Sequence, residues 1–100
     1  MTQSEAVEVL RKAGLHARAL DRGDIMGGSF VDRSTNINVV QNSFWVYPVE
    51  GGLYRIQFED VVEGSFTLEA AVELVTSRIP PGQDIEPTPR TPNPNGVEYY

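Results

Sequence analysis

The sequence has no cysteine, only one histidine and one tryptophan, and no long run of apolar residues. The lack of cysteine excludes disulfides, thiol catalysis and thiolate metal sites, and it favours a reducing compartment, so we expect a cytoplasmic protein. A membrane span needs roughly 18 to 20 consecutive apolar residues, and the chain has no such run. The first residues also lack a signal-peptide pattern. We therefore predict no membrane partner.

Basic residues are scarce too: eight Lys and Arg stand against fourteen Asp and Glu, giving a net charge of -6 at pH 7. Nucleic acids are bound through Lys and Arg that displace counterions, and the chain shows no basic stripe, so we expect no nucleic-acid partner. An acidic surface steers basic proteins toward it. We therefore predict another protein, of basic character, as the partner. The plainer explanation, that the charge only keeps the chain soluble, stays open.

Proline is concentrated at one end of the chain, where residues 80–100 hold six of the seven prolines. Proline donates no backbone hydrogen bond and disfavours helix in the residue before it. Hydrophobic periodicity is confined to the residues before this segment. We therefore predict a single small α+β domain over residues 1–79 and a Pro-rich extended or disordered tail over residues 80–100.

Helical spacing of apolar residues predicts one helix near the N-terminus, capped by Ser4 and followed by a left-handed Gly14. A second helix begins after Thr67 and ends before two prolines. The segments between them favour strands, over 29–31, 37–41, 44–49 and 53–59. The predicted fold class is α+β: a helix, a three- or four-stranded antiparallel sheet and a helix, with both helices on one sheet face.

The last two strands form a predicted hairpin with two competing registers. A two-residue Gly51-Gly52 loop places Pro48 opposite Arg55, at a pair that exchanges two hydrogen bonds, and proline has no donor for it. A three-residue loop over 50–52, with Gly52 left-handed, places Pro48 opposite Tyr54 at a pair without hydrogen bonds. We favour the second register because it leaves no donor missing.

The favoured register places Trp45, Tyr47, Leu53 and Arg55 on the face away from the helices. Nothing obvious in the sequence covers that face, and Trp, Tyr and Arg are the residues that most often anchor protein interfaces. We predict that this face binds a protein. Two alternatives stay open: the tail folds back over the face, or the other register holds and Trp45 belongs to the core.

Glu59, Asp60 and Glu63 form the densest acidic run of the chain, and we include them in the predicted binding site as a patch for a basic partner. The alternative is a solvated acidic loop. Neighbouring residues of a strand point to opposite faces, so Glu59 and Asp60 do not share a metal easily. Asp21 to Asp24 is interpreted as a polar turn. We predict no metal and no cofactor.

His16 is the one candidate for acid–base catalysis. A histidine acts as a general base only beside an organised nucleophile or carboxylate, and nothing in the sequence positions one. Phosphate-binding and dinucleotide-binding glycine motifs are absent. We therefore predict that the protein is not an enzyme, and we keep a small hydrolase that uses His16 as the second alternative.

The stretch Gly28-Ser29-Phe30-Val31-Asp32-Arg33-Ser34 resembles the Gly-Thr-Phe-Leu-Val-Arg-Glu-Ser strand of SH2 phosphotyrosine-binding domains. Residues 53–56 and the helix over 66–75 are similar to later pieces of that family. The resemblance implies a phosphopeptide-binding module in which Arg33 binds phosphate with two parallel hydrogen bonds. Asp32 departs from the family pattern, which has an apolar residue there, and Leu53 stands where a histidine is common.

Together these observations favour a small acidic, non-enzymatic protein-binding domain. Its expected role is that of an inhibitor, an immunity-type protein or an accessory factor that binds another protein through the aromatic sheet face. The SH2-like module is the first alternative. A homodimer is a further alternative, because a body of this size gains stability from a second copy.

Overall fold

The computed structural model describes residues 1–87 of the chain. Two helices enclose seven strands in the order α1, β1 to β7, α2, with bounds α1 Gln3–Lys12, β1 His16–Ala19, β2 Ile25–Gly28, β3 Phe30–Asp32, β4 Val39–Gln41, β5 Phe44–Pro48, β6 Tyr54–Gln57, β7 Val62–Phe66 and α2 Leu68–Arg78. Short 3-10 turns join β1 to β2 and β5 to β6. The predicted α+β class is confirmed, but the predicted count of three or four strands is wrong.

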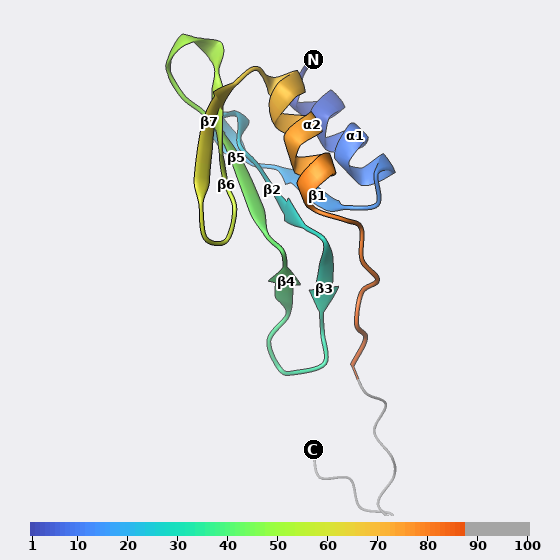
Figure 1. Ribbon diagram of the computed structural model, residues 1–100. Helices are drawn as coiled ribbons and strands as arrows, with labels where there is room; N and C mark the ends of the chain where they lie inside the picture. The colour runs from blue at the N-terminus through green and yellow to red at the C-terminus, as the bar shows by residue number, and fades with distance from the viewer. Residues whose placement is uncertain (88–100) are drawn as a thin grey trace, which may run out of the picture.

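Five strands form one antiparallel sheet in the order β1-β2-β5-β6-β7, and β3 pairs with β4 in a separate two-stranded sheet. Because β3 follows β2 and β4 precedes β5, this second pair continues the middle of the main sheet outward as an arm (Figure 1). We call residues 30–41 the arm. The main sheet and the arm therefore share one continuous hairpin.

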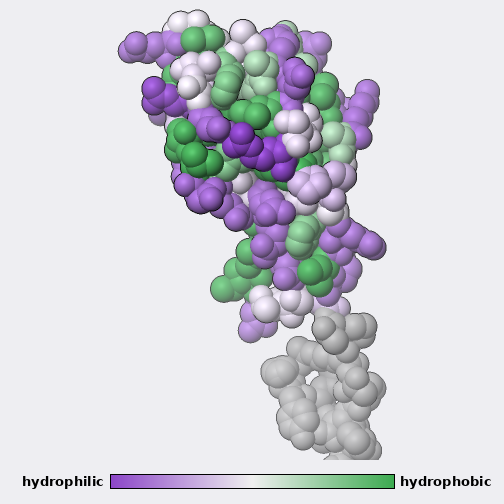
Figure 2. Space-filling view, in the orientation of Figure 1, coloured by the Kyte–Doolittle hydropathy of each residue, from purple (hydrophilic) through white to green (hydrophobic). Residues whose placement is uncertain are grey.

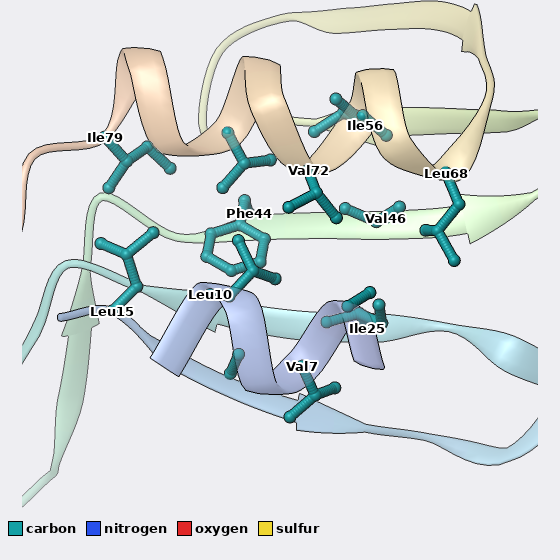
Figure 3. Close-up of a cluster of buried hydrophobic side chains, with 14 of the residues drawn as sticks. Val7, Leu10, Leu15, Ile25, Phe44, Val46, Ile56, Leu68, Val72 and Ile79 are labelled. Atoms are coloured by element: carbon teal, nitrogen blue, oxygen red, sulfur yellow. The ribbon is translucent and has the colours of Figure 1, made fainter. Parts of the chain in front are cut away.

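Both helices pack on the same face of the main sheet, as the sequence predicts, and one buried cluster lies between the two layers (Figure 3). Ile25, Val46 and Ile56 supply the sheet side of this cluster and have no exposed surface. Leu10 of α1 and Val72 of α2 lie in the same cluster. Apolar residues four apart occupy one face of a helix, and this spacing turns that face of each helix inward.

The N-terminus of α1 differs from the prediction at its cap. Thr2, not Ser4, is the N-cap: its side chain accepts from the Glu5 backbone N–H, and the Glu5 carboxylate accepts from the Thr2 N–H. This reciprocal pair satisfies two free N–H groups at once. A cap at Ser4 would have Val7 in the matching position, and valine has no side-chain acceptor to reciprocate.

α1 is followed, as predicted, by a left-handed Gly14, which has φ +89°. The Gly14 N–H donates to the Arg11 carbonyl at 2.9 Å, and the Leu15 N–H donates to the Leu10 carbonyl at 3.1 Å. This pair of bonds is the Schellman arrangement, which glycine favours because it reaches the left-handed region without strain. Leu15 is buried and starts the chain into β1.

The hairpin of β5 and β6 has the favoured register, with Val46 opposite Ile56 and Pro48 opposite Tyr54. The Val49 N–H donates to the Leu53 carbonyl at 2.8 Å and closes the loop. Gly52 is left-handed, with φ +70°. Because hydrogen-bonded and non-hydrogen-bonded pairs alternate in an antiparallel ladder, Pro48 lies at a pair that requires no donor.

Residues after α2 continue the folded body beyond residue 79, where the sequence analysis ends the domain. The Ile85 N–H donates to the Val31 carbonyl at 2.9 Å, and the Arg33 N–H donates to the Ile85 carbonyl at 2.7 Å. Ile85 thereby forms a parallel bridge with Asp32. The segment up to residue 87 is extended and lies along β3. The rest of the predicted tail, residues 88–100, lies outside the described residues.

Candidate functional site

The face of the main sheet opposite the helices carries Trp45, Tyr47 and Arg55 of the predicted binding site, and we call it the open face. Antiparallel pairing lines up five side chains across it, one from each strand: Arg18, Met26, Trp45, Gln57 and Val62. Both helices lie on the other side of the sheet (Figure 1). None of the five side chains is buried, and Met26 is 36% exposed.

Trp45 is half-buried and held in place on the open face. Its indole Nε1–H donates to Asp24 Oδ2 at 2.8 Å. Its ring lies against Tyr47, with 4.6 Å between ring centroids and 37° between the ring planes. The hydrogen bond and the ring contact already restrict the indole. Binding a partner over it therefore costs little further side-chain entropy of Trp45.

Arg55 lies directly opposite Tyr47 on the neighbouring strand and is exposed. Its side chain runs over Gly64 of β7, where a Cβ atom would come within 2.6 Å of Arg55 Cγ. Leu53 is half-buried beside the hairpin loop. The register thus brings Trp45, Tyr47, Leu53 and Arg55 to the same face, as the sequence predicts.

The three residues of the acidic run, Glu59, Asp60 and Glu63, do not lie on one surface. Glu59 follows β6 on the open face and accepts a hydrogen bond from the Ser43 N–H at 3.3 Å, while Asp60 is exposed in the turn to β7. Glu63 pairs with Ile56 and so faces the helices, where it forms an ion pair with Arg78. Glu59 therefore borders the aromatic residues, whereas Glu63 does not join them.

Two hollows on the open face meet at Met26 and Ser43. One is bordered by Trp45, Gln57 and Glu59, and the other reaches toward the arm. Val40 contributes to the second hollow and is 41% exposed. Figure 2 shows hydrophobic atoms on the arm surface. Neither Met26 nor Val40 is among the predicted site residues. Met26 lies in β2, which is not among the predicted strands, and Val40 lies in a predicted strand whose place beside the open face only the structure shows.

A second cluster surrounds the Asp84 carboxylate. It accepts from the Val31 N–H at 2.9 Å, from His16 Nε2 at 2.7 Å and from Arg33 Nη1 at 3.1 Å. The Val31 hydrogen bond and then the His16 hydrogen bond lower the pKa of Asp84 to about 2. His16 therefore has the carboxylate neighbour that the sequence could not show, because the two residues are 68 positions apart.

This cluster also contains the residues on which the two alternative functions, the SH2-like module and the hydrolase, depend. Arg33, which the SH2 resemblance implies as the phosphate ligand, lies 3.1 Å from Asp84 and 3.6 Å from Glu86. Its guanidinium therefore contacts two carboxylates of its own chain. For a hydrolase, His16 would need a nucleophile in reach, and the buried Ser29 hydroxyl donates to the Pro80 carbonyl instead, at 2.6 Å.

Within residues 1–87, no group of three or more His, Asp or Glu side chains is placed to hold a metal ion. None of the described helices has the length and apolar character to cross a membrane. Comparison with protein-family models, curated proteins and solved structures finds no match for the chain. The geometry of the open face therefore carries the functional argument.

Proposed function

We propose that the protein is a small, non-enzymatic protein-binding domain that docks its partner on the open face. The observation that carries this proposal is Trp45, held by Asp24 and Tyr47 yet still partly exposed on the sheet face opposite the helices. A solvent-facing sheet surface more often carries polar residues. Aromatic rings that are already ordered supply contact area at low entropic cost.

The residue types on the open face support binding of a protein surface. Trp, Tyr and Arg dominate interface hot spots, and truncating a hot-spot side chain costs about 2 kcal/mol or more of binding free energy. Here Trp45, Tyr47 and Arg55 are neighbours on two paired strands. Such a cluster at the centre of an interface, with Glu59 and Arg18 at its rim, has the composition of a specific docking site.

The net charge of the chain supports electrostatic attraction of a basic partner. The net charge of -6 favours encounter with a basic protein. Glu8 of α1 and Glu73 of α2 are exposed on the helix layer, away from the open face. An inhibitor or accessory factor that blocks a basic protein would use both features: long-range attraction from the acidic surface and close contact at the aromatic face.

Affinity capture tests this function. The full chain, tagged and immobilised, is exposed to a lysate of its source cell at low salt beside the Trp45→Ala and Arg55→Glu variants. We expect wild type to retain a partner that both variants lose, because both changes lie at the centre of the face. Val9→Ala, which shortens an exposed apolar side chain on α1, is the matched control and should bind as wild type does.

Two results count against the proposed function. One is a wild-type chain that retains no protein at low salt. The other is equal retention by wild type, Trp45→Ala and Arg55→Glu, which would place the contact elsewhere on the molecule. Unchanged circular dichroism of the variants shows that lost binding is not lost folding.

A further inference from the structure

The edge of β3 that faces away from β4 is occupied by residues 84–86, which we call the closing segment. The Ile85 N–H donates to the Val31 carbonyl at 2.9 Å, and the Ile85 carbonyl accepts from the Arg33 N–H at 2.7 Å. This is the pattern of a parallel strand added to the edge of a sheet. The chain after α2 runs beside β3 in Figure 1. The protein thus binds a peptide of its own at this edge.

The same edge also binds an acidic side chain. The Val31 N–H, which a regular parallel strand would satisfy with a backbone carbonyl, donates to Asp84 Oδ1 at 2.9 Å. That oxygen also accepts from His16 Nε2 at 2.7 Å, and Asp84 Oδ2 accepts from Arg33 Nη1 at 3.1 Å. Hydrogen bonds between charged groups are the strong ones, and two carboxylate oxygens have room for all three donors. The donors therefore select an acidic residue at this position.

The next two positions of the closing segment complete the chemical pattern. Glu86 lies 3.6 Å from Arg33 Nη1, so a second carboxylate two residues after the first is attracted to the same guanidinium. Ile85, between the two acidic residues, is 43% exposed, so no enclosed pocket selects its side chain. The edge therefore fits an extended peptide with acidic residues at alternate positions, in which the first carboxylate makes the most contacts.

The closing segment can leave this edge without opening the core. None of its residues belongs to the buried cluster, and Ile85 and Glu86 are exposed. Within residues 1–87, the only carboxylates that pair with Arg33 or His16 belong to the closing segment. Its departure therefore leaves a guanidinium, an imidazole and a backbone N–H together without an acceptor. An acidic peptide from outside restores all three contacts.

We infer that the β3 edge is a binding site for an extended acidic peptide of another protein, and that residues 84–86 close this site in the free chain. The site lies on the arm and uses none of the aromatic residues of the open face, so it goes beyond the proposed function. A short tether gives the closing segment an effective concentration on the order of millimolar. An incoming peptide therefore binds weakly until the closing segment is displaced.

Fluorescence anisotropy of a labelled peptide with the sequence of residues 80–87, added to the full chain, tests the inference. In an opened chain, Asp84→Asn removes the internal carboxylate and Ile85→Pro removes the N–H that donates to Val31. We expect the opened chain to bind the peptide on the order of tenfold more tightly than wild type, because the internal competitor is weakened. Asp84→Asn alone keeps the shape of the side chain and should give a smaller gain, which tests the inference even where the double variant does not fold.

Three controls locate the contact. A peptide with asparagine at the position of Asp84 should bind the opened chain no better than wild type binds the original peptide. Arg33→Gln in the opened chain should remove the gain as well. Arg22→Gln is the matched change, because Arg22 is exposed in the turn that follows β1, at the end of β1 away from His16, and peptide binding should not change. Unchanged thermal unfolding midpoints show that the variants fold.

Each contrary outcome overturns the inference. One is an opened chain that binds the peptide no better than wild type does, and another is equal binding of the asparagine peptide. Equal losses from Arg33→Gln and Arg22→Gln would indicate general charge attraction instead of a site. A wild-type dimer that the double variant abolishes would make a second copy, and not another protein, the occupant of the β3 edge.

Discussion

Asp84 has surroundings unlike those of an ordinary exposed carboxylate. Three donors from separate parts of the chain converge on it: the Val31 backbone, His16 and Arg33. Each donor favours the charged form, which accounts for a pKa of about 2. The carboxylate thus fastens the segment after α2 to β3. This side chain adds to the backbone bonds of Ile85 that hold the proline-rich stretch against the folded body.

Asp84→Asn should release residues 80–87 from β3 with little effect on the rest of the fold. We expect faster amide hydrogen exchange at Ile85 in this variant, because the Ile85 N–H donates to the Val31 carbonyl. Glu86→Gln is the matched control, because Glu86 is exposed and only its 3.6 Å contact with Arg33 changes. Equal Ile85 protection in wild type and Asp84→Asn would show that the backbone bonds suffice.

The pH dependence of the same contact has a definite sign. Asp84 has a folded-state pKa of about 2, below the ordinary 3.8, so its stabilising contribution is complete above about pH 4. That contribution is lost as the pH falls toward 2. We expect Ile85 exchange, corrected for the intrinsic rate, to increase over this window in wild type but not in Asp84→Asn. A flat wild-type profile between pH 4 and 2 would contradict the assignment.

At the scale of elements, the β5–β6 hairpin shows how one proline selects a register. Pro48 has no N–H, and the observed pairing with Tyr54 leaves it at a position that needs none. The glycines of the loop make that pairing reachable, because Gly51 and Gly52 both have positive φ, at 76° and 70°. The turn and the proline therefore agree, and this is why the register could be predicted.

Gly52→Ala should lower the free energy of unfolding by about 1 kcal/mol, because a Cβ disfavours the left-handed conformation. No atom lies within 4 Å of the added Cβ, so the loss is purely conformational. Gly52→Asn is the comparison, because asparagine tolerates this region better and should cost less. Urea unfolding of the three chains measures the order. Equal losses for Ala and Asn would contradict the conformational explanation.

Other elements were not predictable from local sequence. β1, with the sequence His-Ala-Arg-Ala, and β2, with Ile-Met-Gly-Gly, contain few β-branched or aromatic residues. β7 carries Glu63 and Gly64 in its middle, and the sequence predicts no strand there. Strand propensity reflects fit to a neighbouring strand more than any intrinsic preference. These segments are strands because each has a neighbouring ladder to join: β2 pairs with β5, β1 with β2, and β7 with β6.

At the scale of the whole molecule, the two faces of the main sheet have different surroundings. The helix-covered face contains the buried cluster, including Ile56, whereas the next residue along β6, Gln57, belongs to the open face. The buried packing is therefore concentrated on one side of the sheet, and the proposed recognition surface lies on the other. Substitutions one position apart should separate the two properties.

Ile56→Ala should lower the free energy of unfolding by about 2–5 kcal/mol, because it leaves a cavity among fully buried neighbours. Gln57→Ala, one residue away and exposed, should change it by less than about 0.5 kcal/mol. Chemical denaturation of both variants measures the difference. Similar losses at the two positions would contradict a core confined to the helix side.

The sequence by itself determined both helices, the register of the β5–β6 hairpin and the face on which Trp45 and Tyr47 lie, since capping, periodicity and a proline without a donor act over a few residues. The tertiary structure decided the rest. It turned Glu63 toward Arg78, added Met26 and Val40 to the open face and brought Asp84 to His16. These contacts join residues distant in sequence, and no local pattern encodes which distant segments will meet.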